Sequence, residues 1–267
     1  MEKGLSQSSR LERFINAETE LSDILPLVHT TPAFCFADIC KGDSIEPEQC
    51  RFFEKKLLYL FFGRPAYRVE DSVDSELEFN WPIVFIFDPE KVGPIEAVFP
   101  FDTGAFHQKI YKEFFSGRSK IEDFRLPGAL ESARKLIARF YKNASQYFSE
   151  RSTKNVDIPS MEFEAQGVHA LSRLPPIGKG PDERSSTFEV QLSHSIEIAK
   201  SAKAIILPQE YLKLELVVKA LARWNIPIVR FYEVFSFFDT EKRIGQLYPI
   251  VREIFSELGY LKTDLGS

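Results

Sequence analysis

The stretch Trp81-Pro-Ile-Val-Phe-Ile-Phe87 decides the fold class, because this continuous apolar run ends abruptly at Asp88-Pro89. A short apolar run with β-branched and aromatic residues, bounded by a turn signal, predicts a buried strand. The run Leu57-Leu-Tyr-Leu-Phe-Phe62 predicts a second buried strand, which the loop Gly63-Arg-Pro-Ala-Tyr67 ends. Similar patterns predict strands at 26–31, 97–101, 188–192, 204–208 and 226–232, and a strand or turn at 196–198.

Apolar residues at intervals of three to four predict helices between and after these strands. The expected helices cover 32–41, with Gly42 as the stop, 129–150, which has the clearest pattern, 209–224 and 240–258. Because strands and helices are dispersed along the chain, the predicted fold class is α+β. We expect residues 1–21 to form a polar, partly helical and loosely held arm, and residues 22–267 to form a single domain.

One segment of the predicted domain lacks a regular pattern. Residues 151–186 are polar and are interrupted by Pro175-Pro176, Gly178, Gly180 and Pro181, which predicts a long loop. A loop of this length in a compact domain is usually functional or disordered. Its basic residues Arg173, Lys179 and Arg184 are expected either to be solvated or to form a patch that faces an acceptor.

Composition excludes several classes of protein. The 267 residues carry a formal net charge of −5, so the whole molecule is not a basic surface for nucleic acid. The 25 phenylalanines predict a large aromatic core. The N-terminus has no apolar signal core, and no apolar run approaches the roughly 18 residues of a membrane span, which predicts a cytoplasmic protein. Cys35, Cys40 and Cys50 are an odd number, which predicts buried free thiols, and a zinc site with His29 is the alternative.

Most local signatures of catalysis are missing from the sequence. It contains no GxGxxG, no P-loop, no HExxH and no GxSxG. Pairing of Cys35 or Cys40 with His29 or His107 has no local signature either. Asp102-Thr-Gly104 predicts a tight turn in which Asp102 holds its own backbone. Aspartic proteases share this tripeptide, but their site needs a second copy and a barrel-like β fold.

A set of short motifs remains, and their order along the chain is informative. They are His29-Thr-Thr31, Leu60-Phe-Phe-Gly-Arg-Pro-Ala-Tyr67, Pro82-Ile-Val-Phe-Ile86, Phe101-Asp-Thr-Gly104 and Phe188-Glu-Val-Gln-Leu192. In this order they resemble the ADP-ribosyltransferase-fold enzymes, and most of all the DarT-like toxins that modify DNA. The resemblance covers roughly residues 22–235 and implies a split β-sheet core with flanking helices. The chain departs from the pattern at Ala105-Phe106, where the family turn often carries a histidine.

The resemblance implies a role for each matching residue, with NAD as the substrate. Glu189 corresponds to the catalytic glutamate, and Arg64 to an arginine that faces the phosphates. His29, Thr30 and Thr31 correspond to the segment that binds the nicotinamide riboside, and Tyr59 and Tyr67 to aromatic residues beside it. For each residue an ordinary structural role is the alternative: a strand-end histidine, a surface arginine, core tyrosines and an outward-facing strand glutamate.

The implied activity is mono-ADP-ribosylation of a macromolecule, either nucleic acid or protein, by a toxin or phage-defence enzyme with an antitoxin or immunity partner. The acidic charge balance weighs against DNA as the acceptor, because phosphate contacts need Lys and Arg. The alternatives are an NAD glycohydrolase, a binding module of the same fold that has lost turnover, and a Mg²⁺-dependent nuclease or other hydrolase. No metal site is expected for the ADP-ribosyltransferase.

Overall fold

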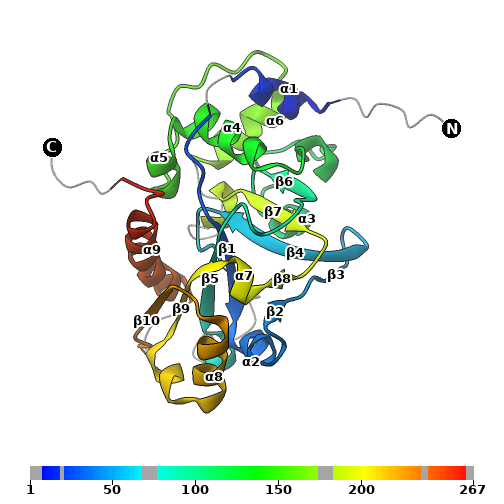
Figure 1. Cartoon of the computed structure of the whole chain (residues 1–267). Coiled ribbons are helices and arrows are strands. Elements are labelled where there is room, and N and C mark those ends of the chain that lie inside the picture. Colours follow the sequence, from blue (N-terminus) through cyan, green and yellow to red (C-terminus); the bar gives the residue numbers. More distant parts are fainter. Residues whose placement is uncertain (1–7, 19–20, 68–76, 174–182, 236–239, 263–267) are drawn as a thin grey trace. The chain divides into compact units, whose positions relative to one another are not determined.

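Strand β5 (Pro82–Phe87) has six buried residues and pairs with a neighbour on each side. The computed structural model of the chain describes residues 8–18, 21–67, 77–173, 183–235 and 240–262. On one edge, β5 pairs antiparallel with β1 (Leu27–Pro32) over six residue pairs. On its other edge, it pairs antiparallel with β9 (Ala202–Pro208), as Figure 1 shows. The apolar run at 81–87 is therefore a central strand, as its composition predicts.

The sheet around β5 is mostly antiparallel, and the α+β prediction is confirmed. Its strands include, in order, β10-β9-β5-β1-β4-β7, and β10 (Ile228–Tyr232) pairs in parallel with β9. Strand β4 covers Lys55–Phe62 and β7 covers Glu189–Leu192. Two small pairings accompany it: β3 (Glu48–Cys50) pairs with β4, and β2 (Ser44–Ile45) pairs with β8 (Ile196–Glu197).

The chain divides into two compact units, each made of two segments. Unit 1 comprises residues 1–23 and 96–189, and unit 2 comprises residues 24–95 and 190–267. The boundary falls inside β7, so Glu189 belongs to unit 1 and the other residues of β7 to unit 2.

Unit 2 contains the strands described above and helices that flank them. These are α2 (Ala33–Gly42), η1 (Glu78–Asn80), α7 (Ile198–Ser201), η4 (Gln209–Lys213), α8 (Glu215–Trp224) and α9 (Thr240–Glu257). The ring of Phe36 on α2 lies 6.3 Å from that of Trp224 on α8 and 6.1 Å from that of Phe85 on β5. These aromatic side chains join the two helices to the sheet.

Unit 1 is mainly helical and has an aromatic core. Its elements are α1 (Arg10–Asn16), β6 (Ala97–Phe99), α3 (Thr103–His107), η2 (Ile121–Phe124), α4 (Leu130–Tyr141), α5 (Ala144–Phe148), α6 (Phe163–Leu171) and η3 (Glu183–Ser186). Phe101 is fully buried, and its ring lies 5.1 to 5.6 Å from those of Phe106, Tyr111, Phe115 and Phe124. The predicted aromatic core is confirmed here.

Part of the expected N-terminal arm is a packed helix of unit 1. Residues 10–16 form α1, and its Leu11, Phe14 and Ile15 are buried. The ring of Phe14 lies 6.0 Å from that of Phe140 on α4. Residues 1–7 and 19–20 lie outside the described part of the chain.

The single helix expected at 129–150 is wrong, because the chain forms α4 and α5 instead. Lys142 has a positive φ of 71°, which ends α4. Asn143 then accepts a hydrogen bond from the backbone N–H of Gln146 and so begins α5. Asparagine is favoured at this capping position because its side chain satisfies a free helix N–H.

The long loop expected at 151–186 is also wrong in part, because α6 lies within it. Ala165, Val168 and Leu171 are buried at helical spacing, and Gly167 packs where an added Cβ would lie 2.6 Å from the carbonyl of Phe114. This helix was missed because small and polar residues make up much of it. The prolines and glycines at 175–181, and Lys179 with them, fall outside the described residues.

Several other boundaries differ from the predictions. Gly42 is the last residue of α2, and Asp43 takes the left-handed conformation (φ 60°) expected of a glycine stop. Asp43 is held there by hydrogen bonds from Arg223 and Trp224. The helix expected at 209–224 is the short η4 followed by α8, with Leu214 extended between them (ψ 115°). The strand expected at 97–101 ends earlier, at Phe99.

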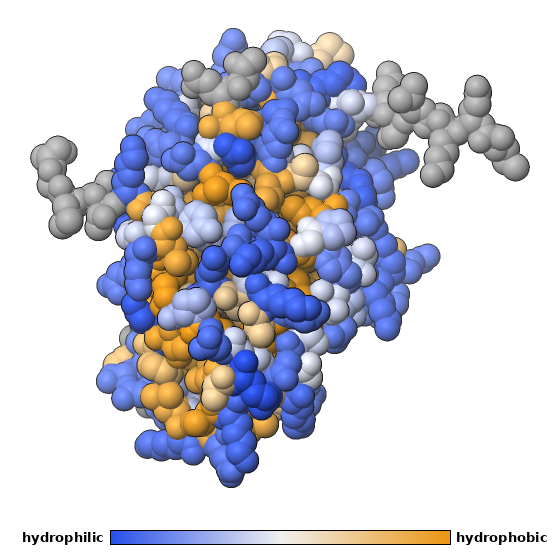
Figure 2. All heavy atoms as spheres, in the orientation of Figure 1, coloured by the Kyte–Doolittle hydropathy of each residue, from blue (hydrophilic) through white to orange (hydrophobic). Residues whose placement is uncertain are grey.

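Apolar side chains are also exposed on unit 2. Leu212, Leu214, Leu216 and Val218 are each 39 to 48% exposed, and Figure 2 shows hydrophobic surface at the bottom of the view, where η4 and α8 lie. Within the described residues, no helix combines the length and the apolar character that a membrane crossing needs.

Candidate functional site

Glu189 is a buried carboxylate at the start of β7, with 2% of its surface exposed. Its partner is Thr103, the first residue of α3. The backbone N–H of Thr103 donates to Glu189 Oε2 at 2.9 Å. The Thr103 hydroxyl lies 2.8 Å from Oε1 and 3.1 Å from Oε2. The expectation that Glu189 could be an ordinary outward-facing strand residue is therefore wrong.

Asp102, the residue before Thr103, caps the N-terminus of α3. Its Oδ1 accepts the backbone N–H of Ala105 at 2.9 Å, which caps the helix. Its Oδ2 lies 3.0 Å from Arg184 Nη1, and its own N–H donates to the carbonyl of Arg184 at 3.3 Å. The Asp-Thr-Gly sequence therefore forms a helix N-terminus, in which Asp102 holds its own backbone as expected.

The basic patch expected between 151 and 186 is not formed by Arg184. Its side chain is 14% exposed and is engaged with Asp102, so it does not project as a solvated charge. Arg173 is exposed and donates to the carbonyl of Lys154. Lys179 lies outside the described residues.

In unit 2, the ring of His29 has a defined tautomer. Its Nδ1 lies 2.8 Å from the carbonyl oxygen of Tyr59. Because a carbonyl oxygen only accepts, Nδ1 carries the proton and Nε2 of the neutral ring is an acceptor. Burial lowers the pKa of His29 below its usual value, against a smaller opposing effect of the Tyr59 hydrogen bond. The ring is therefore neutral at pH 7 and presents a lone pair at Nε2.

Strands β1 and β4 separate where His29 lies. They pair only at Leu27 with Phe62 and at Val28 with Phe61. Both strands continue past this point, β1 to Pro32 and β4 back to Lys55, without further pairs between them. Instead, the ring of His29 forms a hydrogen bond with the backbone carbonyl of Tyr59, a residue of β4.

The three adjacent residues 29–31 do not share one face of β1. Successive side chains of a strand point to opposite faces, so His29 and Thr31 share a face and Thr30 lies on the other. Thr31 is buried. Thr30 Oγ1 is buried without a hydrogen-bond partner among the described residues. Of the expected ribose-binding set, the strand geometry therefore brings together His29 and Thr31 but not Thr30.

Arg64 is fully buried, so the alternative of a surface arginine is wrong. It follows Gly63, whose N–H donates to the carbonyl of Pro26 and extends the β1–β4 pairing by one residue. Gly63 has a φ of +67°, so the extended backbone of β4 ends before Arg64.

The two tyrosines of the expected site are half-buried and belong to unit 2. Tyr59 supplies the carbonyl that orients His29. The hydroxyl of Tyr67 donates to the carbonyl of Asn80 at 3.1 Å, and burial raises its pKa.

The metal and thiol alternatives find no support in the described residues. These residues contain no group of three or more His, Cys, Asp and Glu side chains arranged to hold a metal ion. Burial raises the pKa of Cys40 to about 12, and burial together with Glu48 raises that of Cys35. Both thiols are therefore protonated near neutral pH, which opposes a role as nucleophile.

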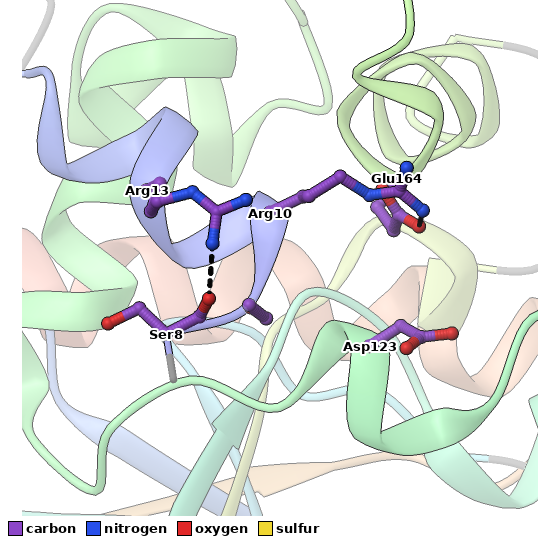
Figure 3. Close-up of a pocket in the computed structure, with 6 residues that line it drawn as sticks. Ser8, Arg10, Arg13, Asp123 and Glu164 are labelled. Carbon is purple, nitrogen blue, oxygen red and sulfur yellow. Dashed lines mark hydrogen bonds and ion pairs between the residues drawn. The ribbon is translucent and has the colours of Figure 1, made fainter. Parts of the chain in front are cut away.

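A cavity of about 250 Å³ in unit 1 contains none of the expected site residues. It is lined by Ser8, Ser9, Arg10, Arg13, Asp123 and Glu164, most of which Figure 3 labels. Glu164 is 5% exposed, and its Oε1 lies 2.7 Å from Arg10 Nη2. The Arg10 guanidinium also lies 5.7 Å from the ring centre of Phe163. These contacts join α1 to α6, and sequence reasoning missed them because the two residues are far apart in the chain.

A second cavity, of about 390 Å³, lies in unit 2. It is lined by Gln209, Glu210, Leu212, Lys213, Glu233, Val234 and Phe235. It too contains none of the expected site residues.

Comparison of the chain with protein-family models, curated proteins and solved structures gave no match.

Proposed function

We propose that this chain is an NAD-dependent mono-ADP-ribosyltransferase that transfers ADP-ribose to a macromolecular acceptor. The observation that carries the proposal is the burial of Glu189 with its carboxylate held by Thr103. A carboxylate is costly to bury, so its place inside unit 1 calls for a specific role. Support also comes from the order of motifs along the chain, which resembles that of DarT-like toxins, with Glu189 in the position of their catalytic glutamate.

Glu189 has the chemistry that cleavage of NAD needs. Breaking the bond between nicotinamide and ribose develops positive charge on the ribose, which a fixed carboxylate stabilises. The same carboxylate can accept a hydrogen bond from a ribose hydroxyl or take the proton of an acceptor. A carboxylate with a fixed orientation serves these roles better than a mobile one, because no reorganisation is needed as charge develops.

His29 is assigned to a ribose hydroxyl of NAD. Its neutral ring presents Nε2 as an acceptor, since Nδ1–H is held by Tyr59. It lies where β1 and β4 stop pairing, which agrees with the split sheet that the resemblance implies. Thr31 shares its strand face and is the second member of this ribose-binding pair.

Arg64 is assigned by resemblance to the pyrophosphate of NAD. A guanidinium can contact a pyrophosphate through two hydrogen bonds. Because Arg64 is fully buried and Glu189 is 2% exposed, NAD reaches these side chains only if the segments that cover them move. The proposal rests first on Glu189 and His29, and the assignment of Arg64 rests on the resemblance alone.

The proposed biological setting is that of a toxin or phage-defence enzyme that is restrained by an antitoxin or immunity protein. The resemblance to DarT-like toxins supports this setting. The acceptor is nucleic acid or protein, and a labelling assay with NAD distinguishes the two.

The test follows the nicotinamide and the ADP-ribose parts of NAD separately. Purified chain is incubated with NAD labelled in its adenylate part, alone and with single-stranded DNA, RNA or a protein lysate. Nicotinamide release and covalent attachment of the label are measured together. We expect Glu189→Gln to lower nicotinamide release by about 100-fold or more, the scale on which positioned charges and proton acceptors contribute to catalysis.

Glu197→Gln is the matched control, because Glu197 is an exposed glutamate whose side chain is 62% accessible. It should retain the wild-type rate. Nicotinamide release without attachment of the label would identify a glycohydrolase. A raised melting temperature with NAD, but no release, would identify a binding module without turnover. Equal rates for the wild type and Glu189→Gln would refute the assignment of Glu189.

A further inference from the structure

We propose that Asp102 and Thr103 are positioning residues, which fix the Glu189 carboxylate in the orientation that catalysis needs. This inference rests on the proposed function. It gives a role to the Asp-Thr-Gly sequence, which the sequence alone suggests only as a turn. Neither residue is assigned a contact with NAD.

Thr103 holds the carboxylate at two points. Its N–H lies 2.9 Å from Oε2, and its hydroxyl lies 2.8 Å from Oε1. One contact would leave the carboxylate free to rotate about it, whereas contacts to both oxygens fix the plane of the group. Thr103 is 1% exposed and Glu189 is 2% exposed, so water does not compete with these hydrogen bonds.

Asp102 fixes the residue that holds Glu189. By accepting the N–H of Ala105, it sets the first turn of α3 and so the direction of the Thr103 N–H. A Cβ at position 104 would lie 3.0 Å from Asp102 Oδ1, so Gly104 leaves room for this cap. The short helix and its cap therefore act as one element.

The segment that leads into β7 is attached to this element at both ends. Arg184 pairs with Asp102 through its side chain and its carbonyl, and Glu189 binds Thr103. Between them, Tyr141 donates to the carbonyl of Ser186, and Tyr147 accepts the N–H of Phe188. These contacts restrain residues 184–189, so the backbone that carries Glu189 is fixed together with its side chain.

This arrangement predicts an effect on turnover and not on substrate binding. Misplacing a catalytic group by about 1 Å can lower the rate by 10²-fold. Removing only the hydroxyl should cost less, since the N–H contact remains. We expect Thr103→Val, which preserves the shape of the side chain, to lower kcat by about tenfold or more while KM for NAD stays within about threefold.

The conservative variant Thr103→Ser retains the hydroxyl, and its kcat should recover to within about threefold of the wild type. Ser132→Ala is the matched control for stability. It removes a hydrogen bond to the carbonyl of Pro127 from a buried residue of the same unit, and Ser132 has no contact with Glu189 among those described. Melting temperatures of all variants are measured beside kcat and KM.

The outcomes separate this inference from the proposed function. Absence of nicotinamide release by the wild type, or wild-type turnover by Glu189→Gln, would overturn both. If Glu189→Gln is inactive and Thr103→Val keeps its kcat, the positioning role alone is refuted. Three other outcomes also refute it. Ser132→Ala loses as much kcat as Thr103→Val at an equal shift in melting temperature, or Thr103→Val raises KM while its kcat is unchanged. The third is that the kcat of Thr103→Ser does not recover.

Discussion

Gly63 ends β4 with a backbone conformation that alanine tolerates poorly, and we expect Gly63→Ala to destabilise unit 2 strongly. Its φ is +67°, in the left-handed region that L-residues avoid. A Cβ at this position would lie 2.5 Å from Leu25 Cδ1 and 3.0 Å from Leu25 Cβ. Leu25 is fully buried, so its side chain has no free space to move into.

Two costs add to give the expected magnitude. The left-handed conformation costs an L-residue about 1–2 kcal/mol. Inserting a methyl group into a packed core costs a further amount of about 1–3 kcal/mol. The free energy of unfolding should therefore fall by about 2–5 kcal/mol. With a denaturant slope of about 2 kcal/mol per molar urea, the midpoint falls by about 1–2.5 M.

Gly42→Ala is the control, because Gly42 ends α2 in the same unit and an added Cβ would meet nothing within 4 Å. Its midpoint should be unchanged or slightly raised, since alanine favours a helix over glycine by up to about 1 kcal/mol. Unfolding in urea is followed by tryptophan fluorescence, which reports on unit 2 because both tryptophans, Trp81 and Trp224, lie there. A Gly63→Ala midpoint within about 0.3 M of the wild type would refute this reasoning, as would equal destabilisation by Gly42→Ala.

Two further predictions concern titratable groups. Because the folded-state pKa of His29 is lowered, the unfolded chain binds more protons below about pH 6.5, so stability falls as the pH drops through that value. In urea unfolding between pH 7.5 and 5, His29→Asn should lose less stability than the wild type, and an equal loss would contradict this. Ellman's reagent at pH 8 should label Cys35 of the native protein slowly and leave the buried Cys40 unlabelled. The unfolded protein should yield three labelled thiols. Rapid labelling of Cys40 in the native protein would contradict its raised pKa.

Local patterns were sufficient for most strands and for several helices. The runs at 57–62 and 81–87 are continuous and apolar, and both form strands within one residue or two of the expected bounds. The pattern failed where a capping residue divides a helical stretch, as at Asn143, and where small residues line a buried face, as at Gly167. In both cases apolar periodicity does not reveal the contact that decides the helix bounds. These contacts are the Asn143 capping hydrogen bond and the close packing of Gly167 against Phe114.

The candidate site was less predictable than the strands that carry it. The alternating residues of β7 are compatible with an exposed or a buried Glu189, and the contact with Thr103, 86 residues earlier, decides for burial. The tautomer of His29 likewise depends on the carbonyl of Tyr59, 30 residues away. Arg64 was expected at a surface or on a phosphate, and its complete burial follows from the packing of unit 2.

The sequence by itself determined the α+β class, the positions of the central strands and the order of the motifs, because these depend on periodicity and turn residues within a short window. Only the tertiary structure decided that β1 and β4 separate at His29, that Thr30 lies on the opposite face from His29, and that the Asp-Thr-Gly sequence holds Glu189. These features depend on hydrogen bonds between residues distant in the chain. The partners of a buried polar group are set by which elements pack together, and a local pattern does not contain that information.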